Sequence, residues 1–171
     1  MGFFRFLFKA LLVIVVLIGI GLFAARFNDG PIEIIAGGEL VAGELYSGAE
    51  PDWSFVKELD TVEFQLLTPP RSRTTWIVEA DGRVFIPCGY MTTWWGKIWK
   101  KWPIEAEKDG RIVLRADGKR YLRTLVRRSN DEIPPEVFSE LARKYLGGNA
   151  MPDNAVTSGY LWIFELVPRP A

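Results

Sequence analysis

The chain has 171 residues and equal numbers of acidic and basic side chains, so its formal net charge is zero and gives no electrostatic argument for a nucleic acid partner. It contains no histidine and one cysteine, Cys88. These counts exclude an internal disulfide, Ser-His-Asp and Cys-His catalysis and histidine-ligated haem, and we expect no bound metal.

The N-terminal segment Leu7–Ala25 is long and apolar enough to cross a membrane. As an α-helix it would span about 28 Å, which matches the hydrocarbon core of a bilayer. Lys9 is its only charge and lies near its start, from where the ammonium can reach the interface. A cleaved signal peptide is the alternative, but Leu22 and Phe23 stand where a cleavage site needs small residues. We therefore predict an uncleaved anchor in contact with the lipid bilayer.

The charges that flank this segment predict its orientation. Arg5 and Lys9 lie on the N-terminal side, whereas Arg26 stands alone on the other side and is followed by Asp29 and Glu33. The positive-inside rule then places the N-terminus in the cytoplasm. We predict a single-pass protein of a bacterial-type inner membrane, with its domain on the periplasmic or extracellular side.

The rest of the chain fits one domain of ordinary size. We assign residues 1–27 to the membrane anchor, 28–36 to a linker and 37–171 to the domain. The stretch 32–45 alternates apolar and small residues, which predicts short strands with tight bends. One or two helical turns follow, with Asp52 as N-cap.

Alternating apolar residues predict a strand over 62–66 that ends at Pro69 and Pro70. Two hairpins follow, with turns at Asp81-Gly82 and Asp117-Gly118, because Asp-Gly suits the positive φ values of a type I′ turn. Cys88 falls inside the first hairpin, where we expect a small core residue because no histidine is present to activate the thiol.

The tryptophan-rich stretch 92–103 predicts an amphipathic helix that Pro103 ends. At 100° per residue one arc of this helix carries Trp94, Trp95, Ile98, Trp99 and Trp102. A second helix is expected over 134–148, with prolines at its start and glycines at its end, and a last strand over 160–168. The order of elements favours a mostly β protein, a closed or nearly closed antiparallel barrel with two helices, behind one N-terminal transmembrane helix.

The stretch "VEFQLLTPPRSRTTWIVEADGRVFIPCGYMTTWWGKIWKKWPIEAEKDGRIVLRADGKRYLRTLVRR" resembles the pyridoxamine 5′-phosphate oxidase-like, FMN-binding split barrels, and among them the deazaflavin-dependent nitroreductase-like members. The resemblance covers roughly residues 37–168 and lies in element order and turn placement. It implies an antiparallel split barrel with FMN or a deazaflavin at a dimer interface. The positions that match its cofactor-binding residues are Arg71, Ser72, Arg73, Thr74, Thr75 and Lys97.

Several of these features have simpler interpretations. Arg71, Ser72 and Arg73 also suit a solvated turn, because arginines in turns are usually exposed. The arc of the tryptophan helix suits core packing, a stacking platform for a flavin ring, or contact with a partner subunit or the lipid headgroups. For that contact the candidate residues are Trp94, Trp95, Trp99 and Trp102.

Basic residues crowd the second hairpin, whereas the stretch 39–63 is acidic. We expect these regions to pair within the domain, since cross-strand pairs of opposite charge are common. Alternation places Arg123 on the same face as Ile112 and Leu125, which predicts a partly buried arginine that requires an anion.

Two functional hypotheses follow. The first is a non-catalytic accessory or binding subunit of a membrane protein complex, with other membrane subunits or a second copy as partner. The alternative is a membrane-tethered oxidoreductase that uses FMN or a deazaflavin. A domain exported unfolded cannot carry a non-covalent flavin across the membrane, and the N-terminus has no twin-arginine signal. The first hypothesis is therefore preferred.

Overall fold

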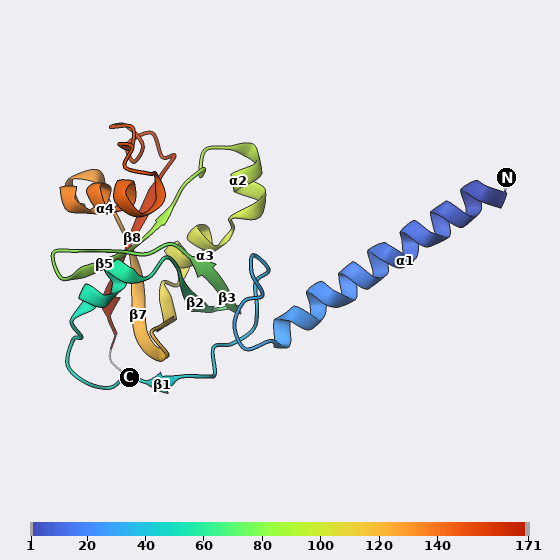
Figure 1. Cartoon of the computed structure of the whole chain (residues 1–171), viewed down its shortest axis with the longest axis horizontal. Coiled ribbons are helices and arrows are strands. Elements are labelled where there is room, and N and C mark those ends of the chain that lie inside the picture. The colour runs from blue at the N-terminus through green and yellow to red at the C-terminus, as the bar shows by residue number, and fades with distance from the viewer. Residues whose placement is uncertain (1, 170–171) are drawn as a thin grey trace.

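The N-terminal helix α1 (Gly2–Ala24) projects away from the rest of the protein, and the 3-10 turn η1 (Ala25–Phe27) joins it to the domain (Figure 1). This computed structural model describes residues 2–169, without the side chains of Lys97 and Trp99. Within Phe3–Phe27 the most apolar 18-residue stretch has a mean hydropathy of 2.8 and is not buried against the domain. In length and composition α1 is able to cross a membrane.

The domain is built on one curled, mostly antiparallel sheet of eight strands. The strands run in the order β3-β2-β6-β7-β8-β5-β4, and the short strand β1 adds a parallel pairing to β7. The edge strands β3 and β4 leave the sheet open as a half-barrel, so the antiparallel fold is confirmed in its coarse form. The strands are β1 (Glu44–Leu45), β2 (Val62–Leu67), β3 (Pro70–Thr75), β4 (Val78–Ala80), β5 (Arg83–Cys88), β6 (Arg111–Ala116), β7 (Lys119–Arg128) and β8 (Trp162–Pro168).

Both Asp-Gly hairpins are confirmed. Asp81 and Gly82 have φ values of 54° and 70° between β4 and β5, and Asp117 and Gly118 have 48° and 71° between β6 and β7. The residues that follow β2 differ from the prediction, because β2 turns directly into the antiparallel strand β3. Arg71, Ser72 and Arg73, which also suited a solvated turn, therefore lie in an edge strand of the sheet.

Two apolar clusters hold the sheet. The first lies inside the curl and contains Phe64, Phe164 and Trp102 of helix α3 (Trp102–Lys108). The second packs helix α4 (Pro135–Tyr145) on the sheet through Val137 and Leu141. Two smaller 3-10 elements, η2 (Trp53–Glu58) and η3 (Asn130–Glu132), complete the domain, and Asp52 caps η2 as predicted.

The prediction of one long tryptophan helix is wrong. The structure has two short helices, α2 (Trp94–Trp99) and α3, which are separated at Lys100 and Lys101 (Figure 1). Pro103 lies in the first turn of α3 instead of ending α2, because its fixed φ and missing N–H suit that position in a helix. The two helices therefore direct their tryptophans independently.

The segment expected as a linker lies against the sheet. Asp29 accepts hydrogen bonds from the backbone N–H groups of Val41 and Ala42 at 2.9 and 3.0 Å and from Nη1 of Arg115 at 2.8 Å. Arg115 also pairs with Glu63 of β2. Of the short strands expected over 32–45, the structure has β1 and isolated bridges. Hydrogen bonds and ion pairs thus attach this segment to the barrel.

Candidate functional site

The residues predicted to bind a cofactor phosphate lie on the edge strand β3, where side chains alternate between the two faces of the sheet. Arg71, Arg73 and Thr75 pair across the strands with Leu66, Phe64 and Val62 and share their inward face. Ser72 and Thr74 point to the opposite face. At the outer edge of β3 the backbone of Ser72 pairs with Gly37.

The contacts of these side chains differ accordingly. Nη2 of Arg73 lies 3.4 Å from Glu105 of α3, and burial lowers the pKa of Arg73. Thr74 donates to the carbonyl of Glu33. Nη1 of Arg71 and Oγ of Ser72 are buried without a partner among the described residues, but they lie on opposite faces. The five residues therefore do not converge on one phosphate group, and the side chain of Lys97 lies outside the described part of the chain.

Helix α2 presents its apolar residues to the solvent. Trp94, Trp95 and Ile98 are 76%, 42% and 63% exposed. The start of α2 is capped by Thr93, whose side chain accepts a hydrogen bond from the N–H of Gly96. Gly96 also packs closely on the preceding loop, because a Cβ at this position would lie 2.0 Å from the carbonyl oxygen of Tyr90. This leaves the outer face of α2 as a candidate contact surface, defined by Trp94, Trp95 and Ile98.

The other two predicted contact residues fall elsewhere. Trp102 is 7% exposed and packs edge-on against Phe64, with ring centroids 5.0 Å apart. It is a core residue, because α3 turns it into the curl of the sheet, and the prediction that it contacts a partner or a membrane is wrong. The side chain of Trp99 lies outside the described part of the structure.

A pocket of about 220 Å³ lies where the edge of β7 changes its partner. Along this edge β8 pairs with 123–128 and β1 pairs with 119–120, so the interval at Tyr121 and Leu122 is covered by neither strand. The loop 46–51 closes the opposite wall. Residues with polar or aromatic side chains that line the pocket include Tyr46, Ser47, Glu50, Tyr121, Arg123 and Arg169.

Arg123 is the chemically distinctive residue of this pocket. Its side chain is 4% exposed, and its Nη1 donates to Oε2 of Glu50 at 2.9 Å. The guanidinium carbon lies 4.7 Å from the ring centroid of Trp53, close enough for a cation–π contact. Its Nε is buried without a partner among the described residues. The predicted buried arginine on this face is confirmed, and Glu50 is the anion that the sequence analysis did not identify.

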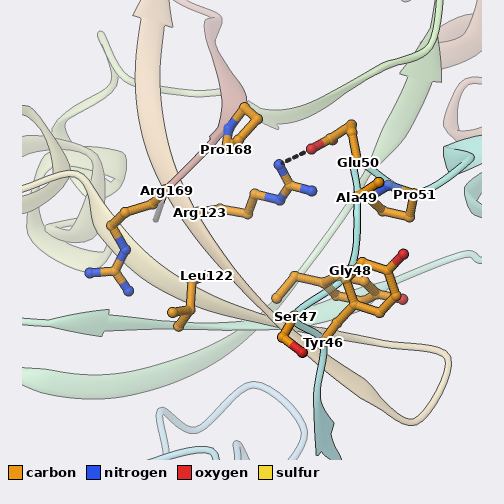
Figure 2. A pocket seen from close by; sticks show the side chains of 11 residues that line it. Tyr46, Ser47, Gly48, Ala49, Glu50, Pro51, Leu122, Arg123, Pro168 and Arg169 are labelled. Carbon is orange, nitrogen blue, oxygen red and sulfur yellow. Dashed lines mark hydrogen bonds and ion pairs between the residues drawn. The ribbon is translucent and has the colours of Figure 1, made fainter. Parts of the chain in front are cut away.

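Figure 2 shows the guanidinium of Arg123 directed toward Glu50, with Tyr46 on the same side of the pocket. Arg169 lies on the other side, and its guanidinium is turned away from Arg123. Burial, followed by the nearby charge of Arg111, lowers the pKa of Arg169. The arrangement suits recognition of a small anion by one arginine within an aromatic wall.

Cys88 is a core residue, as predicted. Its thiol is buried, and its Sγ lies 3.7 Å from Sδ of Met91. Burial raises the pKa of Cys88 to about 11. The thiolate fraction at neutral pH is therefore very small, which agrees with a packing role.

Comparisons with known proteins do not identify the chain. No protein-family model matches the sequence, and neither does any curated protein. Similar solved structures include a candidate pyridoxamine 5′-phosphate oxidase from Listeria innocua, with 9% identity, a TM-score of 0.45 and coverage of 68% of this chain and 89% of that one. A conserved hypothetical protein from Mycobacterium tuberculosis has 14% identity, a TM-score of 0.42 and coverage of 74% and 83%. The agreement with the antiparallel split barrel expected from the sequence rests on the curled, open sheet of this chain itself.

Proposed function

We propose that this chain is a single-pass membrane protein whose split-barrel domain is a non-catalytic accessory or binding subunit of a membrane protein complex. The domain lies on the periplasmic or extracellular side, and the exposed face of α2 contacts a neighbouring subunit. The observation that carries the proposal is the apolar surface of α1, which is exposed along the helix and belongs to neither core cluster.

The cost of leaving α1 in water supports a membrane location. Most of its side chains are large and apolar, and each buried CH₂ group is stabilised by about 0.8 kcal/mol relative to water. A bilayer covers such a surface on all sides, and a helix uses all its backbone hydrogen bonds internally. Arg5 and Lys9 at the N-terminal end support a cytoplasmic N-terminus.

The position of α2 supports a partner within the membrane assembly. Trp94, Trp95 and Ile98 form an exposed apolar face, and α2 lies on the side of the domain from which α1 projects (Figure 1). Exposed tryptophans are common anchors of protein interfaces. The cofactor-binding alternative has weaker support, because Arg71 and Ser72 diverge to opposite faces of β3.

The first experiment tests the anchor in the full chain. Replacing both Val13 and Val16 by aspartate places two charges in the middle of α1, each of which disfavours insertion by about 2.5–3.5 kcal/mol. We expect the wild-type protein to stay in the membrane pellet after carbonate extraction and the aspartate variant to be released. The matched control replaces the same two residues by leucine and should behave like the wild type.

Two further readouts separate the alternatives for α1. A mass spectrum of the purified protein that begins after Ala25 would show a cleaved signal and overturn the anchor. A reporter fused after Ala171 should be active on the periplasmic side. Activity confined to the cytoplasm would reverse the topology and favour the cofactor-binding alternative.

The second experiment tests the role of α2. The double variant Trp94→Ala, Trp95→Ala should release the protein from a complex purified in mild detergent. The control Trp76→Ala removes a tryptophan that stacks on Tyr145 of α4 and whose exposure, 46%, is close to the 42% of Trp95, and it should leave the complex intact. Equal behaviour of both variants would refute the contact. Absorbance near 450 nm in the purified complex would indicate a bound flavin and contradict the non-catalytic role.

A further inference from the structure

The pocket at the β7 edge contains an arginine with an unused hydrogen-bonding edge. Nη1 of Arg123 bonds Glu50, whereas its Nε is buried without a partner in the described chain. Nε and Nη2 of an arginine lie along one edge of the planar guanidinium and offer two parallel N–H groups. This edge matches the two oxygens of a carboxylate.

A buried N–H group without an acceptor requires an explanation. Leaving one unpaired costs about 1–3 kcal/mol, and native structures contain only a few such groups. Glu50 does not supply the missing acceptor, because its Oε2 is bonded to Nη1 and its Oε1 accepts from Nε1 of Trp53 at 2.6 Å. An oxyanion in the pocket would complete the hydrogen bonding of Arg123.

The charge of the pocket favours an anion. Its lining contains two arginines, Arg123 and Arg169, and one carboxylate, Glu50, which leaves an excess of one positive charge. Glu50 is 48% exposed, so water screens its charge more effectively than that of the buried guanidinium. A ligand with a single negative charge would neutralise the pocket.

Two tyrosines, Tyr46 and Tyr121, form the aromatic part of the pocket lining. Tyr121 lies with its ring centroid 5.3 Å from that of Tyr46 and 4.9 Å from that of Trp53. Burial raises the pKa of Tyr121, and Asp117 and Tyr46 raise it further, so the phenol is neutral at physiological pH. The volume of about 220 Å³ is below the roughly 300–1,000 Å³ of pockets for drug-sized ligands. A small ligand with a flat apolar body suits these walls.

We propose that this pocket binds a small, planar monocarboxylate through the Nε–Nη2 edge of Arg123, with the body of the ligand against the tyrosines. A phosphate dianion suits the pocket less well, because its second charge and third oxygen would face Glu50. The site is independent of the proposed partner contact. The end of the domain that holds β1 lies away from α2 (Figure 1).

The test uses the full chain in detergent and isothermal titration with benzoate, acetate and inorganic phosphate at one ionic strength. Benzoate should bind with a stoichiometry of one and more tightly than acetate or phosphate. No binding of benzoate would overturn the proposal. Binding of phosphate as tight as that of benzoate would overturn the assignment to a carboxylate.

Three variants locate the binding. Arg123→Gln should weaken benzoate binding at least tenfold, whereas Arg127→Gln, which removes an arginine of the same strand outside the pocket, should leave it unchanged. Glu50→Gln removes the competing carboxylate and should tighten binding several-fold. Because Arg123→Gln is a core substitution, Glu50→Gln decides the matter if the first variant does not fold. Weaker or unchanged binding in Glu50→Gln would overturn the proposal.

Discussion

The two short helices α2 and α3 come from one tryptophan-rich stretch and use their tryptophans in opposite ways. Trp94 of α2 is 76% exposed, whereas Trp102 of α3 is 7% exposed and contacts Phe64 and Phe164. The break at Lys100 and Lys101 changes the direction of the second helix, so a single helical arc does not describe both. The difference shows that composition alone does not separate a core tryptophan from a contact tryptophan.

The largest expected effect is at Trp102. Trp102→Ala should lower the free energy of unfolding by about 3–5 kcal/mol, because it removes a buried ring and leaves a cavity among aromatic neighbours. For a domain of this size that corresponds to a fall in melting temperature of roughly 6–20 °C. Thermal unfolding measured by circular dichroism checks the value. A loss below about 1 kcal/mol would mean that Trp102 does not belong to the core.

Substitution of Gly96 tests how much the packing of α2 against Tyr90 contributes to stability. Gly96→Ala should lower stability by about 1–3 kcal/mol, because the added Cβ would lie 2.0 Å from the carbonyl oxygen of Tyr90 and the backbone must shift. The loss is expected to be smaller than at Trp102, since α2 is able to move without opening the core. Hydrogen exchange over 94–99 should become faster in this variant.

The matched control for Gly96 is Gly19→Ala in α1. A Cβ at Gly19 meets nothing within 4 Å, and alanine favours a helix more than glycine does. This variant should keep the stability of the domain. If Gly96→Ala behaves in the same way, the contact between α2 and Tyr90 has no structural importance.

The sequence predicted elements whose signals are local. The Asp-Gly turns were identified because they need positive φ, and α4 because prolines open it and Gly147 and Gly148, both with positive φ, follow its end. The inward position of Arg123 followed from strand alternation. The break between α2 and α3 was missed because periodicity counts apolar residues and does not detect a change of direction.

Contacts between residues that are far apart in the sequence could not be predicted from such local patterns. Asp29 and Arg115 are 86 residues apart, and their pairing attaches a segment that looked like a linker. The pocket depends on where β1 and β8 stop along β7, which composition does not reveal. The partner of Arg123, Glu50, comes from an acidic stretch expected to pair with this hairpin, but the individual pair was not predictable.

The smallest expected change in stability is at Trp94, in the exposed part of the tryptophan-rich stretch 92–103. Trp94→Ala should alter the free energy of unfolding by no more than about 0.5 kcal/mol, because the Trp94 side chain is exposed and takes no part in the cap that Thr93 makes at the start of α2. Cys88, the only cysteine in the chain, provides a second readout, since it belongs to the same core cluster as Trp102. With a pKa of about 11, its alkylation should be slow at pH 7 and rise about tenfold per pH unit toward pH 11. Trp94→Ala should reproduce this profile, and Trp102→Ala should react faster at every pH. Faster alkylation of Cys88 in Trp94→Ala would show that α2 shields the core, and the proposed division between a contact helix and a core helix would then be wrong.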